Sequence, residues 1–234
     1  PLILRHPGQE PYLSPMKLAV HNEKRETYTA YLHTSPEYTM KKMLAAGFEK
    51  IFSLGKCFRD YESFGGTHNP EFTMIEWYRA QKDMFALMRD VEQLWQFLLD
   101  KLEKIETRNS KLGTPSFQFP RLARLASSES RRAVSSFRRV HMRDLWREHV
   151  GVNLDDYLDL ESMTKLCMAH YSPALPAGRL PVTHYAFYED AFYKIFLNQI
   201  EPKLTAPTIV HHYPAPMAAL AKLSEREPGY AERF

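Results

Sequence analysis

Two strand-length segments, 51–58 and 71–79, constrain the fold of this 234-residue chain more than any other feature. Both have alternating side-chain character, and the polar loop between them contains two glycines, which is typical of a long antiparallel hairpin. Because successive strand residues point to opposite faces, one face of the second segment carries four side chains: Phe72, Met74, Glu76 and Tyr78.

A carboxylate between apolar neighbours on that face is costly to bury unless a cation meets it. The pattern therefore predicts a site for a positively charged group at Glu76. The alternative is an edge strand, on which Glu76 lies in water or pairs with a nearby arginine of the chain itself.

A short helix is predicted just before the hairpin. Ser35 and Pro36 form a helix start, because the hydroxyl can cap the first turn and the missing N–H of proline costs nothing there. Gly47 stands where a left-handed cap would end the helix. Between these signals, apolar residues recur on one helical face: Met40, Met43 and Leu44.

The rest of the chain predicts an α+β fold. Apolar periodicity and turn residues predict strands at 16–21, 29–34 and 208–213, and helices from Asp83 to about Leu102 and at 141–150, 158–170 and 188–200. The apolar stripe of the long helix indicates core packing rather than a cofactor site. His211 and His212 are adjacent in the last strand, so they are expected on opposite faces and not at one metal ion.

The segment 115–140 is rich in arginine and serine. It contains only one acidic residue, Glu129. Its arginines are Arg121, Arg124, Arg131, Arg132, Arg138 and Arg139. Such segments bind RNA or acidic protein surfaces, or are solvated inserts, and the composition leaves these alternatives open.

Composition narrows the class of protein. A net charge of +3 is too small to indicate nucleic-acid binding by itself, and no run of eighteen apolar residues predicts a membrane span. Two cysteines, Cys57 and Cys167, have no metal-site spacing and fit a reducing compartment. With no secretory leader apparent, a cytoplasmic protein is expected.

Several segments resemble a known family. FRD at 58–60, a glycine-bearing loop and HNPEF at 68–72 resemble motif 2 of the class II aminoacyl-tRNA synthetases. TSPEY at 34–38, with MKKMLAAGFEKIF at 40–52 and HNPEFTMIEWYR at 68–79, is similar to the lysyl branch. The SPEY form is closer still to the short paralogues of that branch, the ligases that attach β-lysine to elongation factor P.

The resemblance implies roles for seven residues. Arg59 would contact the α-phosphate of ATP and the amino-acid carboxylate, and His68 the outer phosphates. Phe72 would stack on adenine, and Glu62 would meet the adenine edge, although FRDYE replaces the family's Arg-Asn-Glu order at this point. Three residues would hold the amino acid: Glu37 its amino group, and Glu76 and Tyr78 its distal amine.

The resemblance also implies a domain organisation. Residues 1–104 would form the catalytic antiparallel sheet with flanking helices, 105–206 a basic linker and helical insertion, and 207–234 a return to the catalytic sheet. The fold would be incomplete at both ends. Pro1 would follow the motif 1 helix, which builds a homodimer, while motif 3 and the Mg²⁺ ligands would follow Phe234, so no metal ligand is predicted within the chain.

The implied activity is ATP-dependent activation of lysine or β-lysine as an aminoacyl-adenylate. A site of arginine, histidine and carboxylates suits this reaction, because it brings two anions together and needs no nucleophilic side chain. Three hypotheses remain: transfer to a lysine of elongation factor P, charging of tRNA-Lys by a synthetase core, or binding without catalysis because motif 3 is absent.

Overall fold

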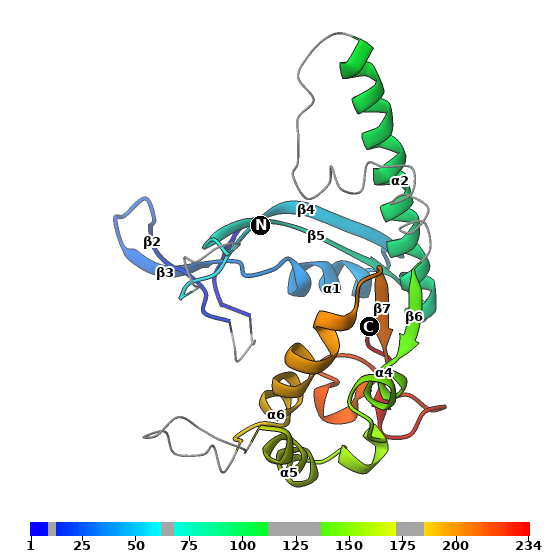
Figure 1. Cartoon of the computed structure of the whole chain (residues 1–234). Coiled ribbons are helices and arrows are strands. Elements are labelled where there is room, and N and C mark those ends of the chain that lie inside the picture. The colour runs from blue at the N-terminus through cyan, green and yellow to red at the C-terminus, as the bar shows by residue number, and fades with distance from the viewer. Residues whose placement is uncertain (9–12, 62–67, 112–136, 172–184) are drawn as a thin grey trace, which may run out of the picture. The chain divides into compact units, whose positions relative to one another are not determined.

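The computed structural model describes residues 1–8, 13–61, 68–111, 137–171 and 185–234. The chain divides into two compact units, Pro1–Lys82 and Asp83–Phe234. The described residues combine helices with small sheets, most of them antiparallel, which confirms the predicted α+β class (Figure 1). None of the described helices has the length and apolar character needed to cross a lipid bilayer.

A three-stranded antiparallel sheet begins the first unit, in the order β1-β3-β2. Its strands are β1 Ile3–Leu4, β2 Lys17–His21 and β3 Thr27–Leu32. The turn between β2 and β3 is held by Asn22, whose Oδ1 accepts hydrogen bonds from the backbone N–H groups of Lys24 and Glu26. The strands predicted at 16–21 and 29–34 are thus confirmed to within two residues.

Helix α1, Glu37–Ala45, follows as predicted. Ser35 Oγ accepts a hydrogen bond from the Glu37 N–H at 3.2 Å, although Pro36 rather than Ser35 takes the capping position. Gly47 has a φ of +97° and donates its N–H to the Leu44 carbonyl at 3.0 Å, so it ends the helix in the left-handed region.

The predicted hairpin is formed by β4, Lys50–Phe58, and β5, Glu71–Arg79. Its antiparallel register places Cys57 opposite Phe72, Gly55 opposite Met74, Ser53 opposite Glu76 and Ile51 opposite Tyr78. These eight residues share one face, which is more covered than the other. The opposite face exposes three apolar side chains: Phe52, Leu54 and Ile75.

The second unit begins with the long helix α2, Met84–Lys111. Asp83 caps it, because its Oδ1 accepts a hydrogen bond from the Ala86 N–H at 2.8 Å. Met84 and Met88 are buried together with Ile209 of a later strand, as expected for an apolar stripe that serves core packing.

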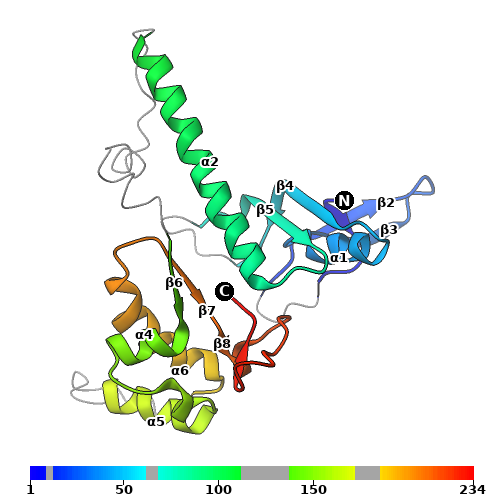
Figure 2. The same ribbon diagram turned by 90° about the vertical axis from the view of Figure 1, so that its right-hand side faces the viewer.

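Strands β6 and β7 lie side by side in parallel in the second unit, with helices packed beside them (Figure 2). The remaining elements are β6 Arg138–His141, α4 Met142–His149, α5 Leu160–Tyr171, α6 Tyr188–Ile195, a π-helical segment Phe196–Ile200, β7 Thr208–His211, β8 Tyr213–Pro214 and β9 Tyr230–Ala231. Short 3-10 helices lie at Leu154–Tyr157, Glu201–Lys203 and Ala215–Met217. β8 and β9 pair antiparallel.

The main core of this unit is formed by α4, α5 and α6. Trp146 and Phe192 are completely buried, with ring centroids 5.0 Å apart. Truncation of such a buried aromatic side chain typically costs about 3–5 kcal/mol, so these helices depend on the contact. The helices predicted at 141–150, 158–170 and 188–200 are confirmed with shifted ends.

The basic segment 115–140 is described only at its end. Arg138 and Arg139 lie there in strand β6, which the sequence did not predict. The other arginines of the segment lie outside the described residues. The long helix belongs to the second compact unit. The functional division into 1–104, 105–206 and 207–234 remains a prediction.

Candidate functional site

The covered face of β4 and β5 carries the predicted site residues in a row. Arg59 continues this face beyond β4, where its N–H donates to the Pro70 carbonyl at 2.9 Å. Its guanidinium lies over the Phe72 ring, 5.0 Å from the centroid. Arg59 Nε is buried and has no hydrogen-bond partner among the described residues. A buried donor without an acceptor is costly, so this end of the face suits an anion.

Glu76 stands further along the same face. Its Oε1 accepts a hydrogen bond from the Tyr78 hydroxyl at 2.7 Å, and the pair is partly buried. Among the described residues Glu76 forms no ion pair, so the alternative in which a nearby arginine neutralises it is not observed. The pKa of the Cys57 thiol is raised mainly by burial and then by the negative charge of Glu76.

Glu37 lies in the first turn of α1 and is paired with Lys41 one turn later. The Lys41 Nζ to Glu37 Oε1 distance is 2.5 Å, and the Glu37 side chain is 19% exposed. A carboxylate at a helix N-terminus is favoured by the helix dipole. Glu37 is thus a carboxylate in a favourable position that already has a cation from its own helix.

His68 and Glu62 are not brought to this row by any observed contact, and the observed contacts of Glu37 are within its own helix and the residues just before it. His68 is exposed before β5, and no hydrogen bond or ion pair joins it to Arg59 within the described part of the chain. Glu62 lies outside the described residues. Their ATP-binding roles remain predictions.

A cavity of about 500 Å³ lies between α1 and β4. Residues of the helix line one side of it and residues of β4 line the other, including Met40, Met43, Ser53, Gly55 and Cys57. This volume is within the range of small-molecule sites. The helix and the strand pair thus leave room for a ligand, but neither Arg59 nor Glu76 is among the residues that line this cavity.

Cys57 and His33 do not form a nucleophile and base in this cavity. His33 Nε2 lies 2.7 Å from the Lys56 carbonyl and therefore carries a proton, while the Cys57 Sγ is 3.7 Å away. Since burial raises the pKa of the Cys57 thiol, the sulfur stays protonated and unreactive. The face can bind and orient charged groups, but it offers no covalent chemistry of this kind.

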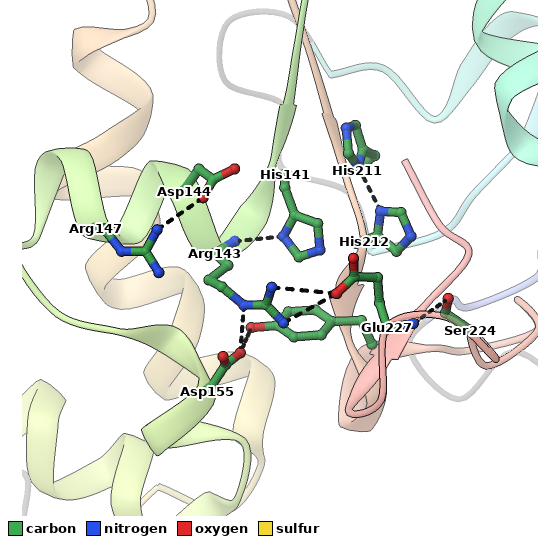
Figure 3. Close-up of polar contacts among 10 residues, drawn as sticks. His141, Arg143, Asp144, Arg147, Asp155, His211, His212, Ser224 and Glu227 are labelled. Atoms are coloured by element: carbon green, nitrogen blue, oxygen red, sulfur yellow. Dashed lines mark hydrogen bonds and ion pairs between the residues drawn. The ribbon is translucent and has the colours of Figure 1, made fainter.

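A second polar cluster, formed by His141, His211 and His212, lies in the second unit (Figure 3). His211 and His212 do not point to opposite faces, so that prediction is wrong: their Nδ1 atoms are 2.6 Å apart. The reason is local, because His212 directly follows strand β7 and has a φ of +58°. His141 stacks on His212 with ring centroids 4.7 Å apart.

Burial suppresses protonation of this histidine cluster. The pKa of His141 and that of His211 are each lowered to about 4, first by burial and then by the charge of neighbouring histidines. Burial also lowers the pKa of His212. Within the described residues no group of three or more histidine, cysteine or acidic side chains is arranged to hold a metal ion.

Arg143 is surrounded by partners beside the histidines (Figure 3). Its Nε lies 2.7 Å from Asp155, and its Nη atoms lie 3.4 Å from Glu227. Its guanidinium covers the Tyr230 ring at 4.8 Å, and the Tyr230 hydroxyl donates to Asp155. Although burial raises the pKa of Asp155, hydrogen bonds from Tyr230 and Arg143 outweigh it and keep that pKa below its usual range. The network therefore stabilises this unit.

Sequence reasoning missed this network, since its members are up to 84 residues apart and carry no shared motif. Two arginines of the basic segment are also used internally. Arg138 pairs with Glu148 at 2.5 Å, and Arg139 pairs with Glu92 at 2.7 Å. These two residues therefore contribute to the fold, whatever the rest of the segment does.

Comparisons with known proteins point to one family. The model of the family described as "tRNA synthetases class II (D, K and N)" matches residues 7–234 of this chain. A lysine–tRNA ligase of Ureaplasma urealyticum is 31% identical over 214 residues, which are 92% of this chain and 38% of that protein. An elongation factor P–(R)-beta-lysine ligase of Photorhabdus laumondii is 33% identical over 88% of this chain and 51% of its own, and that of Histophilus somni is 35% identical over the same shares. The chain spans about half or less of these relatives.

Proposed function

Because the chain belongs to the class II tRNA synthetases of the D, K and N type, we propose that it forms part of an ATP-dependent ligase that activates lysine or β-lysine. One observation carries the proposal. A single strand-pair face bears Arg59, whose buried Nε has no hydrogen-bond partner among the described residues, and Glu76, a carboxylate that accepts a hydrogen bond from a phenol and has no ion pair within that part of the chain. Such a face is complementary to a ligand with an anionic end and an ammonium end.

The reaction joins the amino-acid carboxylate to the α-phosphorus of ATP and releases pyrophosphate. Arg59 contacts the α-phosphate and the carboxylate, so it offsets the repulsion between these two anions and the charge that develops on phosphorus. Phe72 offers a ring face to adenine. The described residues fit the nucleotide through Arg59, but they include no carboxylate cluster for Mg²⁺, so no step here is assigned to the metal.

The amino acid is held at its nitrogen atoms. Glu76 accepts the distal ammonium, and the Tyr78 hydroxyl fixes the carboxylate orientation at 2.7 Å. Glu37 accepts the amino group nearer the reacting carboxylate. These contacts hold the carboxylate beside the phosphate, and such positioning accounts for much of the rate in reactions without a protein nucleophile.

The favoured acceptor is a lysine of elongation factor P. SPEY at 35–38 and the relatives that carry the elongation factor P ligase name support it. Charging of tRNA-Lys is the second candidate, supported by the lysine–tRNA ligase relative that matches 92% of this chain. A cytoplasmic location belongs to the same proposal, because both acceptors are components of translation. A homodimer also belongs to it, through the resemblance to a family whose motif 1 builds a dimer.

The test has two stages. Exchange of labelled pyrophosphate into ATP is first measured with lysine and with (R)-β-lysine, and transfer of the labelled amino acid is then measured to elongation factor P and to tRNA-Lys. Exchange followed by transfer to the protein supports the favoured acceptor, and transfer to RNA supports the second. Tight binding of ATP and lysine without any exchange would mean that this chain binds and does not catalyse.

A further inference from the structure

The two carboxylates proposed to hold the substrate's nitrogen atoms have different partners in the structure. Glu76 is held by the neutral hydroxyl of Tyr78. Glu37 is held by the ammonium of Lys41, 2.5 Å from its Oε1. One carboxylate is therefore left without a cation from the described residues, while the other already has one.

The Lys41 ammonium is chemically the same group as a substrate's amino group. Lys41 stands one turn after Glu37 on α1, so the helix itself keeps the two side chains within reach. A carboxylate has several acceptor positions, but two ammonium groups on one carboxylate repel each other. The Lys41 side chain is 40% exposed, so it can leave into water when a ligand arrives.

We infer that Lys41 is an internal substitute for the substrate's amino group at Glu37, and that it sets the affinity of the site for amines at this position. The inference rests on the proposed role of Glu37. It follows that the distal amine at Glu76 supplies most of the recognition, whereas the amino group near the carboxylate must first displace Lys41. The site thus selects ω-amino acids and is comparatively tolerant of the second amino group.

The test compares two ligands that differ only in that second amino group: L-lysine and 6-aminohexanoate. Their dissociation constants are measured by calorimetry for the whole chain, for Lys41→Met and for Lys42→Met. Methionine keeps the apolar stem without the charge. Lys42 is an exposed neighbour on the same helix, and it forms no ion pair within the described residues, so it is the matched control.

Lys41→Met is expected to tighten lysine binding about two- to fivefold, the scale of an exposed helical ion pair, and to leave 6-aminohexanoate binding unchanged. Lys42→Met should change neither. Weaker or unchanged lysine binding in Lys41→Met overturns the inference, as does an equal gain for both ligands, which would indicate a general charge effect.

A further variant separates this inference from the proposed function. If Glu37→Gln weakens lysine but not 6-aminohexanoate, the role of Glu37 holds, and only the Lys41 result then decides the inference. If the unaltered chain binds neither ligand, both the proposed function and the inference are wrong.

Discussion

The covered face of β4 and β5 and the Arg143 network use the same kinds of side chain in opposite ways. On the strand face, Arg59 has a buried Nε without a partner, and Glu76 is met only by the Tyr78 hydroxyl among the described residues. In the network, Arg143 contacts two carboxylates and an aromatic ring.

This difference indicates which charged residues serve ligand binding and which serve the stability of the fold. A charged group that already has partners gains little from a ligand, and its loss leaves those partners buried without a counter-charge. A charged side chain with an unsatisfied buried donor carries a desolvation cost in the fold, and this cost can be offset when a ligand of opposite charge arrives. Substitutions in the two regions should therefore affect different measurements.

The largest expected effect is on catalysis at Arg59. Arg59→Ala should reduce ATP–pyrophosphate exchange by about 10²–10³-fold or more, because it removes the cation that stabilises charge on the α-phosphate. The urea midpoint should hardly change. Lys56→Ala is the control, since Lys56 points to the opposite face and forms an exposed ion pair with Glu71. Full exchange by Arg59→Ala would refute the assignment of this residue to ATP.

Glu76→Gln should selectively weaken the amino acid. Loss of the charge that meets the distal ammonium is expected to cost about 2–5 kcal/mol of binding free energy, measured as the dissociation constant of lysine, while ATP binding is preserved. Glu71→Gln, on the exposed face of the same strand, is the matched control. An equal loss of lysine and ATP binding would make Glu76 a structural residue.

Arg143→Ala should instead lower stability. Its removal leaves Asp155 and Glu227 without their cation, so we expect the free energy of unfolding to fall by about 2–3 kcal/mol, measured by urea denaturation. Arg147→Ala is the control on the same helix, because its ion pair with Asp144 is exposed on both sides and is worth little. Similar stability of the two variants would contradict the contrast between the regions.

The smallest effect concerns pH. The pKa values of His141 and His211 are lowered to about 4 in the folded chain, so the unfolded chain binds more protons between about pH 6.5 and 4. The free energy of unfolding should therefore fall as pH decreases through this window, by on the order of 2 kcal/mol after allowance for partial exposure, and level off below it.

His211→Asn should reduce this pH slope relative to the unaltered chain, as measured by urea denaturation at a series of pH values. The comparison of the two slopes removes the contribution of carboxylates that titrate in the same range. Parallel curves for His211→Asn and the unaltered chain would show that the histidine cluster is not the cause.

Much of the first unit could be predicted because its signals are local. Alternation predicted which residues of 71–79 share a face, and the polar loop predicted that this strand pairs back onto the first. The register, with Ser53 opposite Glu76, came from the structure. Ser35 and Gly47 similarly marked both ends of α1. The roles assigned to His68 and Glu62 depend on the loop between the strands, and they stay predictions.

The second unit resisted prediction where contacts are distant in sequence. Strand β6 pairs in parallel with β7, which lies about 70 residues later in the chain. The four residues 138–141 are too few for their periodicity to predict that pairing. His211 and His212 were predicted to lie on opposite faces of a strand, but the left-handed backbone of His212 brings their rings together. Such a conformation is uncommon without glycine and is imposed by surrounding packing.

By itself, the sequence determined the hairpin, the helix before it and the family, because each depends on residues close together in the chain. The tertiary structure decided which charges already have partners: Arg143 is satisfied, while the buried Nε of Arg59 has no hydrogen-bond partner in the described part of the chain. Whether a charged group has a partner depends on which distant segments of the chain fold to within a few ångströms of it. Local sequence patterns do not contain that information.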